Sequence, residues 1–566
     1  MFETTWQVLN KEDINNIDTD EIIKNILKNK GILEEEQIKE FLSDKPQRTY
    51  DPFLLKDMKE AVEKIVNHIE NKKSIWIYGD YDVDGITSIS LLMDFLSNFT
   101  DNLNYYIPLR EEEGYGLNCD AIRDIKEKGA DLIITVDCGS TSINEVSLAK
   151  ELGMDIIITD HHNIGEEKPD CLIVNPKQED CEYPFELLCG CGIAFKLAQA
   201  IQKRLDGPKK YLAQVLDLVA LGTVADVVPL VDENRTMLKH GLNRINKGSR
   251  TGLKTLIDKI ELKLGTITST NIAFIIAPHF NASGRIDDAK ASVRLLLSED
   301  MDEINSLVSH LIECNNARKE LQVTCIEKCK NIVEENYTDD LFLVVNSEDG
   351  HEGVIGIVAG KVRDAYYKPA LILTGSSEDG ILKGSGRSIE HIDIYEELKK
   401  HEDLFVKFGG HKNACGFSIK SENLDLLREK LNEEASKKDK EIFVKRIKID
   451  CELMPSQITL EMIEKLKSIE PYGMGNEKPK FLISDAYVNN PYEYRFMGKE
   501  KKHIKLKIKS NKYNDNTKLD LVGFNMADRY MNKLNGTNQV QVVGFPDVNH
   551  WNGNVYIQFK IEDIKE

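Results

Sequence analysis

The chain has 566 residues, more than one hydrophobic core can fill, so we expect at least three domains. Its 41% of apolar and 30% of charged residues are typical of folded globular domains and exclude a disordered or fibrous chain. The net charge of −21 excludes a protein that coats nucleic acid with its whole surface, because such binding depends on lysine and arginine.

The first half of the chain contains a helical region followed by a sheet. Residues 1–74 are predicted to be helical, because apolar residues recur at helical spacing in the segment that follows the breaker Asp51-Pro52. From residue 75, short apolar runs alternate with amphipathic segments, which is typical of a parallel sheet covered by helices on both faces. We therefore expect an N-terminal helical region at 1–74 and an α/β domain at 75–300. The apolar runs are 75–78, 103–107, 132–136 and 156–159.

The second half contains a long helix, a smaller α/β domain and a barrel. Residues 301–337 lack glycine and proline, which predicts one connecting helix. Strand-like segments beyond it indicate a second α/β domain at 338–440. The last part, 441–566, alternates apolar and polar residues between glycine and asparagine turns, which predicts a small β-barrel.

Aspartates and histidines lie where the expected strands end. Loops at the carboxyl ends of neighbouring parallel strands converge on one crevice, so we expect a single site. So many carboxylates repel one another unless a cation is bound. Aspartates with histidine favour Mn²⁺ or Mg²⁺, and two such ions would act on a phosphoryl ester. The residues are Asp80, Asp82 and Asp84 after 75–78, Asp137 after 132–136, and Asp160, His161 and His162 after 156–159.

Each of these motifs also has a simpler interpretation. An aspartate after a strand is often a helix cap or turn residue, and for Asp80 this is about as frequent as a ligand role. The pair His161-His162 could belong to a surface loop. The repeated placement at strand ends favours one joint site over these separate interpretations.

A series of short motifs runs in order along the chain. They are GDYDVDG at 79–85, EGYGL at 113–117, VDCG at 136–139, DHH at 160–162, ALGTVADVVPL at 220–230, NASGR at 281–285, HEGVIGIVAG at 351–360, GSGRS at 384–388 and FGGH at 408–411. This series resembles the RecJ nucleases of the DHH phosphoesterase superfamily. The resemblance implies a DHH catalytic domain, a DHH-associated substrate-binding domain and, from EPYGMGNEKP at 470–479, a C-terminal barrel like the oligonucleotide-binding fold.

The resemblance also implies a site for two Mn²⁺ or Mg²⁺ ions, bridged by Asp137. His162 would face the scissile phosphate. Many DHH proteins carry a histidine ligand four residues before Asp82, where this chain has Tyr78, so Asp80 or water would take that position. The implied ligands are Asp82, Asp84, Asp137, His161 and Asp226.

Substrate contacts are implied in two further places. Arg285 of the catalytic domain and Ser385, Arg387, Gly409, Gly410 and His411 of the DHH-associated domain would form a pocket for the terminal phosphate of a strand. Guanidinium groups and glycine backbones bind phosphate well. In the barrel, a basic strand face with nearby aromatic rings is a track for single strands or simply a solvated face. Its residues are Lys505, Lys507 and Lys509, opposite Ile504, Leu506 and Ile508, with Tyr492, Tyr494 and Phe496 nearby.

The expected function is 5′ to 3′ hydrolysis of single-stranded DNA in recombination and repair. Two alternatives stay open: another DHH phosphoesterase that acts on RNA or oligonucleotides, and a catalytically inactive replication scaffold. The resemblance implies a single-strand binding protein and a RecQ-type helicase as partners. No segment reaches the roughly 20 apolar residues of a membrane span and the first residues are polar, so we expect a cytoplasmic protein.

Overall fold

The computed structural model describes residues 4–10, 18–110, 112–376, 378–488, 494–498, 500–510, 517–527 and 539–565. The chain forms two compact units. One consists mainly of Tyr50–Asp226 and His240–Lys445, and the other mainly of Trp6–Thr49, Val227–Lys239 and Arg446–Glu566. Within the described ranges, no helix is both long enough and apolar enough to cross a membrane.

The first unit contains a five-stranded parallel sheet with the order β3-β2-β4-β5-β6. Strands β2 and β4 are buried along their whole length, which explains their uninterrupted apolar sequences. The chain passes from β2 to β3 on one side and then to β4 on the other, so a topological switch point lies between β2 and β4. The strands are β2 (Ile75–Gly79), β3 (Leu103–Tyr106), β4 (Leu132–Val136), β5 (Asp155–Thr159) and β6 (Leu172–Val174).

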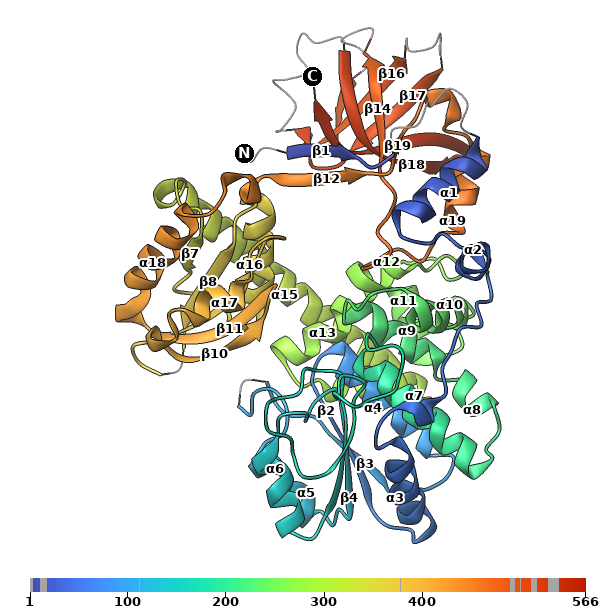
Figure 1. Cartoon of the computed structure of the whole chain (residues 1–566), viewed down its shortest axis with the longest axis vertical. Coiled ribbons are helices and arrows are strands. Elements are labelled where there is room, and N and C mark those ends of the chain that lie inside the picture. Colours follow the sequence, from blue (N-terminus) through green and yellow to red (C-terminus); the bar gives the residue numbers. More distant parts are fainter. Residues whose placement is uncertain are drawn as a thin grey trace. The chain divides into compact units, whose positions relative to one another are not determined.

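Helices cover both faces of this sheet (Figure 1). Alternate strand residues such as Trp76, Ile133 and Ile158 pack with α5 and α6, whereas α3, α4 and α7 cover the opposite face. The α/β architecture predicted for this region is confirmed. The covering helices are α3 (Met58–Glu70), α4 (Val83–Leu96), α5 (Cys119–Glu127), α6 (Ile143–Glu151) and α7 (Gly190–Leu205).

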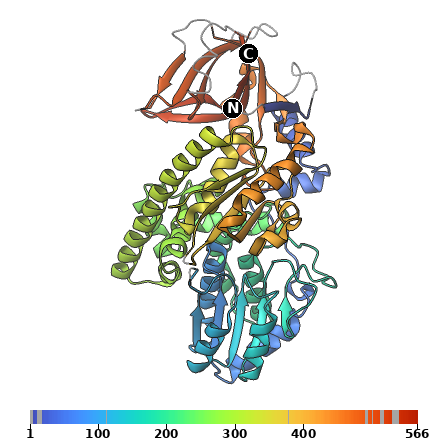
Figure 2. The same cartoon turned by 90° about the vertical axis from the view of Figure 1, so that its left-hand side faces the viewer.

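Further helices extend the first unit beyond the sheet. The short helix α12 continues through a π-helical turn, Ile272–Ile276, into α13. Packed beside α13 is α15 (Met301–Asn336), the long helix that the sequence predicts, which Figure 2 shows along its length in yellow-green. The others are α8 (Lys210–Ala213), α9 (Leu216–Ala225), the second half of α10 (Asp232–Asn246), α11 (Thr251–Lys259), α12 (Ser269–Asn271), α13 (Ala277–Ile286) and α14 (Lys290–Leu297).

A second, mixed sheet follows α15 in the same unit, with the order β10-β11-β9-β8-β7. Only β7 and β8 pair in parallel; the other neighbours are antiparallel. The elements are β7 (Leu343–Asn346), α16 (Glu352–Tyr366), β8 (Ala370–Gly375), β9 (Ile381–Arg387), α17 (Ile394–Lys399), β10 (Phe405–His411), β11 (Ala414–Lys420) and α18 (Leu424–Ser436).

The second unit contains the predicted barrel. Its sheet has the order β13-β14-β18-β19-β17-β16-β15, and an additional pairing of β14 with β16 closes five of these strands into a barrel. A five-stranded barrel of this kind is typical of the oligonucleotide-binding fold. The elements are β12 (Lys445–Ile449), β13 (Cys451–Glu452), α19 (Leu460–Lys467), β14 (Phe481–Tyr487), β15 (Tyr494–Met497), β16 (His503–Ser510), β17 (Lys518–Gly523), β18 (Gln539–Trp551) and β19 (Asn554–Lys565).

The N-terminal segment packs with this barrel. Ile22 and Ile26 of α1 (Thr19–Asn29) share a core with Phe481, and α2 (Glu35–Leu42) flanks them. The helical interpretation of 1–74 is wrong for β1 (Thr4–Val8), a strand that pairs with β12. The partner strand lies more than 400 residues away in the chain, so local periodicity could not reveal the pairing.

Candidate metal centre and phosphate pocket

The first acidic motif lies between β2 and α4, at the switch point of the parallel sheet. The backbone amides of Asp84 and Gly85 donate to Oδ1 of Asp82 at 2.9 and 3.1 Å, so Asp82 is the N-cap of α4. A Cβ at Gly85 would lie 2.3 Å from the carbonyl oxygen of Asp80, so this turn requires glycine. The helix-cap interpretation therefore applies to Asp82, and Asp80 has a buried Oδ1 without a hydrogen-bond partner in the described structure.

Asp137 follows β4 in a left-handed backbone conformation, with a φ of 60°. Residues held in that region cost on the order of 1–3 kcal/mol, and such strain concentrates at functional sites. The start of α7 lies directly against this aspartate, because a Cβ at Gly190 would be 2.5 Å from the Cβ of Asp137. Glycine at position 190 therefore leaves the room that the Asp137 side chain occupies.

Helix ends bring two more carboxylates to the same place. Asp84 accepts hydrogen bonds from the amides of Gly190 and Cys191 at the N-terminus of α7, at 2.5 and 2.9 Å. That helix terminus carries a partial positive charge, which stabilises a carboxylate. Asp226 comes from the end of α9.

His161 lies at the centre of these carboxylates. Its Nε2 is 3.0 Å from Oδ1 of Asp137, 3.7 Å from Oδ2 of Asp226 and 3.9 Å from Oδ2 of Asp84. Three overlapping groups have ligand atoms within 4.8 Å of one another, which is the spacing of donors around a metal ion. They are Asp80 with Asp82 and Asp137, Asp84 with His161 and Asp226, and Asp137 with His161 and His162.

Asp160, the first residue of DHH, shapes the loop and lies in none of these three groups. Its carboxylate accepts from the amides of Ser140, His161 and His162, and from Nδ1 of His162 at 2.8 Å. Burial opposes ionisation of Asp160, but the hydrogen bond and charge of His162 outweigh it and lower its pKa. Burial likewise opposes the charge of His162, and the bond to Asp160 raises its pKa nevertheless. Asp160 therefore orients His162.

The electrostatics of the cluster fit divalent cations. Burial, followed by the neighbouring carboxylates, raises the pKa of Asp84 to about 6, of Asp226 to about 9, and of Asp137 and Asp80 well above the ordinary value. Burial and the adjacent His162 lower the pKa of His161 to about 3, so its ring is neutral and can donate a lone pair.

The hydrogen bonding of the cluster also fits divalent cations. Buried polar atoms normally make hydrogen bonds, yet four atoms of this cluster make none in the described structure, although two of them, Nε2 of His161 and Oδ1 of Asp137, lie 3.0 Å apart. Aspartate oxygens with imidazole nitrogen are ligands that Mn²⁺ and Mg²⁺ accept. The four atoms are Oδ1 of Asp80, Oδ1 of Asp137, Nε2 of His161 and Oδ2 of Asp226.

Tyr78 occupies the position where many DHH proteins have a histidine, and it belongs to the core of the sheet. Its hydroxyl donates to the carbonyl of Gly116 at 2.9 Å, and its ring stacks on Tyr106 with centroids 5.3 Å apart. Asp80, by contrast, lies in the group with Asp82 and Asp137. The structure therefore brings Asp80, one of the two substitutes that the sequence left open for the missing histidine, next to the expected ligands Asp82 and Asp137.

Tyr115 is a site residue that the sequence reasoning missed. Its hydroxyl donates to the carbonyl of Asp137 and lies within reach of Nδ1 of His162, both at 3.2 Å. The ring packs edge-on against His162. The EGYGL motif contains this tyrosine, but the motif alone gives no reason to place it beside His162.

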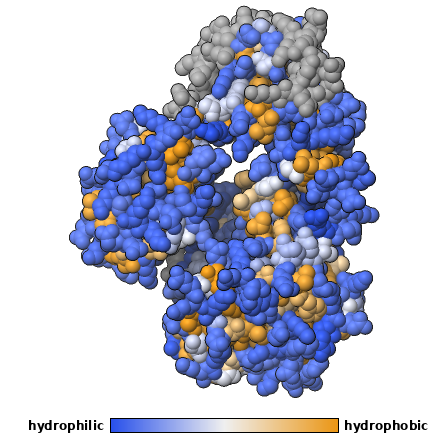
Figure 3. Space-filling model, in the orientation of Figure 1, coloured by the Kyte–Doolittle hydropathy of each residue, from blue (hydrophilic) through white to orange (hydrophobic). Residues whose placement is uncertain are grey.

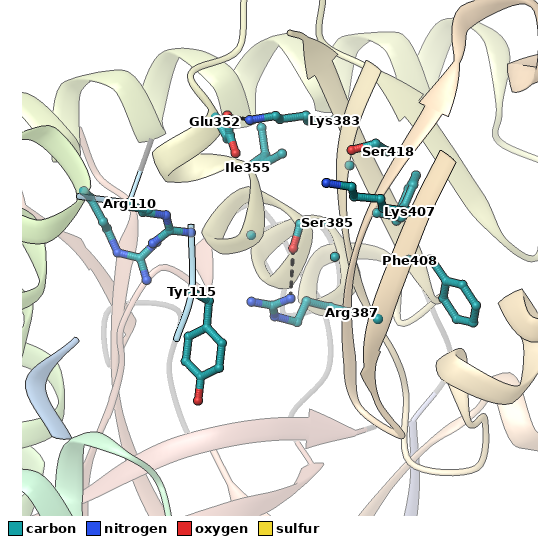
Figure 4. A pocket seen from close by; sticks show the side chains of 16 residues that line it. Arg110, Tyr115, Glu352, Ile355, Lys383, Ser385, Arg387, Lys407, Phe408 and Ser418 are labelled. Atoms are coloured by element: carbon teal, nitrogen blue, oxygen red, sulfur yellow. Dashed lines mark hydrogen bonds and ion pairs between the residues drawn. The ribbon is translucent and has the colours of Figure 1, made fainter. Parts of the chain in front are cut away.

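A pocket of about 510 Å³ brings together most of the predicted phosphate ligands (Figure 4). Arg285, Ser385, Arg387 and Gly409 line it, joined by Arg110, Tyr115 and Lys407, which the sequence did not single out. Arg387 donates to Oγ of Ser385 at 3.1 Å, and Arg285 to the carbonyl of Gly353 at 2.8 Å. Five cations and one carboxylate, Glu352, line the pocket, so it is cationic. Burial and neighbouring arginines lower the pKa of Arg285 to about 10.

The other two predicted pocket residues lie elsewhere. Gly410 and His411 are not among the residues that line the pocket. Burial and the charges of His162 and Lys177 lower the pKa of His411. Gly410 has a φ of 150°, and a Cβ there would lie 2.5 Å from the carbonyl of Ala414, so it serves the β10–β11 turn.

The basic strand of the barrel is observed, but it is partly neutralised. Ile504, Leu506 and Ile508 of β16 are buried, as the alternation predicts. Asp520 of β17 lies 2.9 Å from Nζ of Lys505 and 3.6 Å from that of Lys507. Of the aromatic residues expected nearby, Phe496 is on β15, whereas Tyr492 and the side chain of Tyr494 lie outside the described residues.

Models of three protein families match the chain in succession. The DHH family, N-terminal domain, matches residues 74–223, the DHHA1 domain matches 339–437, and the RecJ OB domain matches 449–563. The chain is 39% identical over 544 residues to the single-stranded-DNA-specific exonuclease RecJ of Bacillus subtilis. This alignment covers 96% of this chain and 67% of the Bacillus protein. It is 32% identical over 531 residues to the protein of the same name in Escherichia coli, covering 90% of each.

Solved structures give the same result. The crystal structure of RecJ in complex with Mn²⁺ from Thermus thermophilus matches with a TM-score of 0.83 and 27% identity, covering 100% of this chain and 80% of that one. The Mg²⁺ complex of RecJ from the same organism matches with a TM-score of 0.78 and 26% identity, covering 100% and 79% of the two chains.

Proposed function

The chain belongs to the RecJ family, and we propose that it is a metal-dependent exonuclease that degrades single-stranded DNA from 5′ to 3′ in recombination and repair. The observation that carries this proposal is the buried cluster at the switch point of the sheet, with four donor atoms that make no hydrogen bond in the described structure. A neighbouring cationic pocket that Tyr115 also lines supports a substrate with phosphate groups.

We assign the metal ligands to Asp82, Asp84, Asp137, His161 and Asp226, with Asp80 in place of the missing histidine. Asp137 belongs to two of the three ligand groups, which supports a bridging role. Two Mn²⁺ or Mg²⁺ ions held there would supply an activated water and stabilise the leaving oxygen of a phosphodiester. The fixed backbone of Asp137 and the amides that hold Asp84 keep the carboxylates in place before any ion arrives.

His162 is the group that we place beside the scissile phosphate. Asp160 holds its Nδ1, and Tyr115 lies against its ring, so its orientation is set from two sides. The raised pKa of His162 keeps a proton on the ring in a wider pH range, which suits a donor to a phosphate oxygen.

The 5′ to 3′ direction of cleavage, in this proposal, depends on the arginine pocket. We propose that Arg285, Ser385 and Arg387 bind the 5′ terminal phosphate, with Gly409 allowing close approach of the backbone, and that His411 and Gly410 border the path between pocket and metal centre. A terminal phosphate carries more charge than a diester, so a cationic pocket selects strand ends. The distance from pocket to metal then determines which bond is cut.

Parallel digestion of 5′-labelled and 3′-labelled strands, each made as DNA and as RNA, tests this function. We expect rapid release of the 5′ label from DNA and slower reaction with RNA. Preferred cutting of RNA would support another DHH phosphoesterase. Binding without cutting, in either metal, would support an inactive scaffold.

The remaining family properties are also proposals. A nuclease limited to single strands needs duplex to be opened and kept open, which favours a RecQ-type helicase and a single-strand binding protein as partners; co-purification with tagged protein tests both. A cytoplasmic location follows from the same role and is tested by fractionation. The expectation of a separate N-terminal region at 1–74 is wrong, because residues 6–49 belong to the unit of the barrel, where Ile22 and Ile26 share its core. We also propose the domains 75–300, 301–337, 338–440 and 441–566, which limited proteolysis tests.

A further inference from the structure

The cationic pocket continues beyond the residues to which we assign the terminal phosphate. Strands β9, β11 and β10 are neighbours in the sheet, and their register places residues in rows across the three strands. Residues two positions apart along a strand share a face, so successive alternate rows line the same side of the sheet. The first row consists of Ser385, Gly416 and Gly409, and the second, the lysine row, of Lys383, Ser418 and Lys407.

The lysine row lies on the side of the pocket away from the metal centre. Two residues along a strand span about 7 Å, so the row lies about that far beyond Ser385. In Figure 4, Tyr115, whose hydroxyl contacts His162, is on the side of Arg387, and the lysine row is on the opposite side. A strand with its terminal phosphate at Arg387 and its next phosphate at the metal centre does not occupy the row. The row is therefore open to a group that extends outward from the strand end.

The side chains and the floor of this part of the pocket suit an anion. Lys407 is exposed, and its ammonium group makes no hydrogen bond or ion pair in the described structure. Nζ of Lys383 lies 2.7 Å from a carboxylate oxygen of Glu352. A Cβ at Gly409 or Gly416 would meet nothing within 4 Å, so the floor is open. In Figure 3 the surface over this sheet is mostly hydrophilic, which fits a charged ligand rather than an apolar one.

The pocket also has more room and more charge than one terminal phosphate uses. Its volume is about 510 Å³, and five cations line it with a single carboxylate, Glu352. A terminal monophosphate carries at most about two negative charges. A triphosphate carries more, and its phosphates, joined through shared oxygens, extend over about the length of two strand residues. Its outermost phosphate therefore reaches the lysine row when its innermost one lies at Ser385 and Arg387.

We propose, on the basis of the exonuclease function above, that the lysine row binds the outer phosphates of a 5′-triphosphorylated strand end. The first phosphodiester then keeps its place at the metal centre. Water adds its oxygen to the phosphorus of that diester, the bond to the 3′ oxygen breaks, and the 3′ oxygen takes up a proton. The released nucleotide keeps its triphosphate, and the rest of the strand keeps a 5′ monophosphate. The enzyme therefore starts on such an end without prior removal of the outer phosphates.

The first product of a 5′-triphosphorylated DNA strand tests this assignment. The full chain in Mn²⁺ is given matched oligonucleotides that carry a 5′ triphosphate or a 5′ monophosphate, and the products are separated by ion-exchange chromatography. We expect both strands to be cut at comparable rates. The first product of the triphosphorylated strand should be a nucleoside triphosphate, and all later products should be nucleoside monophosphates.

Variants show whether the lysine row reads the outer phosphates. With a chelator in place of metal, so that no strand is cut, Lys407→Ala should raise the Kd of the triphosphorylated strand roughly tenfold. The Kd of the monophosphorylated strand should change much less. Glu352→Gln should lower the Kd of the triphosphorylated strand, because it frees Lys383. Lys437→Ala and Glu433→Gln are matched controls, because this pair, 2.9 Å apart, lies on α18, which packs on the buried face of the same sheet.

Inorganic triphosphate distinguishes a strand end from a free polyphosphate. It should compete with the triphosphorylated strand only weakly, because it has no nucleotide to occupy the space between the pocket and the metal centre. Competition as strong as that of the unlabelled triphosphorylated strand would overturn the assignment to a strand end.

The other outcomes separate this inference from the proposed function. A nucleoside monophosphate as the first product, or a triphosphorylated strand that stays intact while the monophosphorylated strand is cut, would overturn the inference and leave the nuclease function standing. The same holds if Lys407→Ala and Glu352→Gln change the ratio of the two Kd values no more than the controls do. A protein that cuts neither strand, in Mn²⁺ or in Mg²⁺, would overturn the function itself.

Discussion

At the carboxyl ends of β2 and β4, aspartates crowd around one histidine, whereas on β9 and the loop after β3 arginines crowd around an open pocket. Both regions keep like charges together, and the acidic region contains four buried atoms that make no hydrogen bond in the described structure. In the acidic region, burial and mutual repulsion raise the pKa of the carboxylates. In the basic region, burial and neighbouring cations lower the pKa of Arg285.

The two regions differ in how rigidly the side chains are held. The carboxylates are fixed by helix N-termini, a left-handed residue and glycines that leave no spare room. Arg285 is held by one carbonyl contact, and Arg387 by one hydroxyl and one carbonyl. A reacting centre needs positions accurate to a fraction of an ångström, whereas a site that captures a terminal phosphate tolerates adjustment. This difference supports our proposal that chemistry belongs to the first region and selection of the strand end to the second.

Replacement of Asp137 tests the acidic half of this comparison and should give the largest effect. Asp137→Asn removes the charge that two ligand groups share, so we expect hydrolysis in Mn²⁺ to fall by at least about a hundredfold, which is about 2.7 kcal/mol in the barrier. Binding of DNA should remain, because the arginines are unchanged. Asp120→Asn, at an exposed surface aspartate, is the control. Turnover above a few per cent of the wild-type value would contradict the bridging role.

Replacement of Arg387 tests the basic half. Arg387→Ala removes a guanidinium that lines the pocket, and a lost charge-assisted hydrogen bond is worth about 1.5–3 kcal/mol. Cleavage of 5′-phosphorylated strands should therefore slow by roughly tenfold or more, and cleavage of 5′-hydroxyl strands much less. Arg387→Lys should retain part of the preference. Equal losses on both substrates, or a preference that resides at the 3′ end, would mean that the pocket does not read the 5′ phosphate.

The sequence predicted the acidic region better than the basic one, for physical reasons. Asp82, Asp137 and His161 follow strands of a parallel sheet, and the strand rule alone brings them together. Asp226 follows no strand, and only the family motif pointed to it. Arg110 and Lys407 come from a loop and a strand of different domains, so no local pattern connects them. The strand β1 was missed because its partner is distant in the chain.

Metal addition at different pH values tests the acidic region further, and we expect a moderate effect on thermal stability. In the metal-free protein, the raised pKa values of Asp84 (about 6) and Asp226 (about 9) mean that the folded state holds more protons than the unfolded state above pH 4. Folding stability of the metal-free protein should therefore fall as pH rises towards about 9. Mg²⁺ should raise the Tm more at the upper end of this window, because it replaces those protons.

Thermal unfolding with chelator and with Mg²⁺, across this pH range, measures the effect. The variant Asp226→Asn should flatten the pH dependence without metal, since its amide does not titrate. A Tm increase that is the same at every pH would contradict a cluster whose carboxylates exchange protons for metal ions.

The barrel should give the smallest effect, because Asp520 already neutralises part of its basic strand. Deleting residues 441–566 is not a clean test, since Ile22 and Ile26 of α1 share the barrel core and would lose their partners. Point changes avoid this. Lys505→Ala with Lys507→Ala should weaken binding of long strands only a few-fold and lower the salt slope, whereas Asp520→Asn should strengthen binding, because it frees both lysines.

These opposite signs distinguish a DNA track from a solvated face. If the strand face is only solvated, neither change should alter DNA affinity. If only the total positive charge matters, replacing any lysine should weaken binding. Lys465→Ala is the matched control, since Lys465 lies in the same unit and pairs with Asp20 at 2.8 Å. If Asp520→Asn fails to raise affinity while the double lysine variant lowers it no more than Lys465→Ala does, strand capture resides in the first unit, with the arginines.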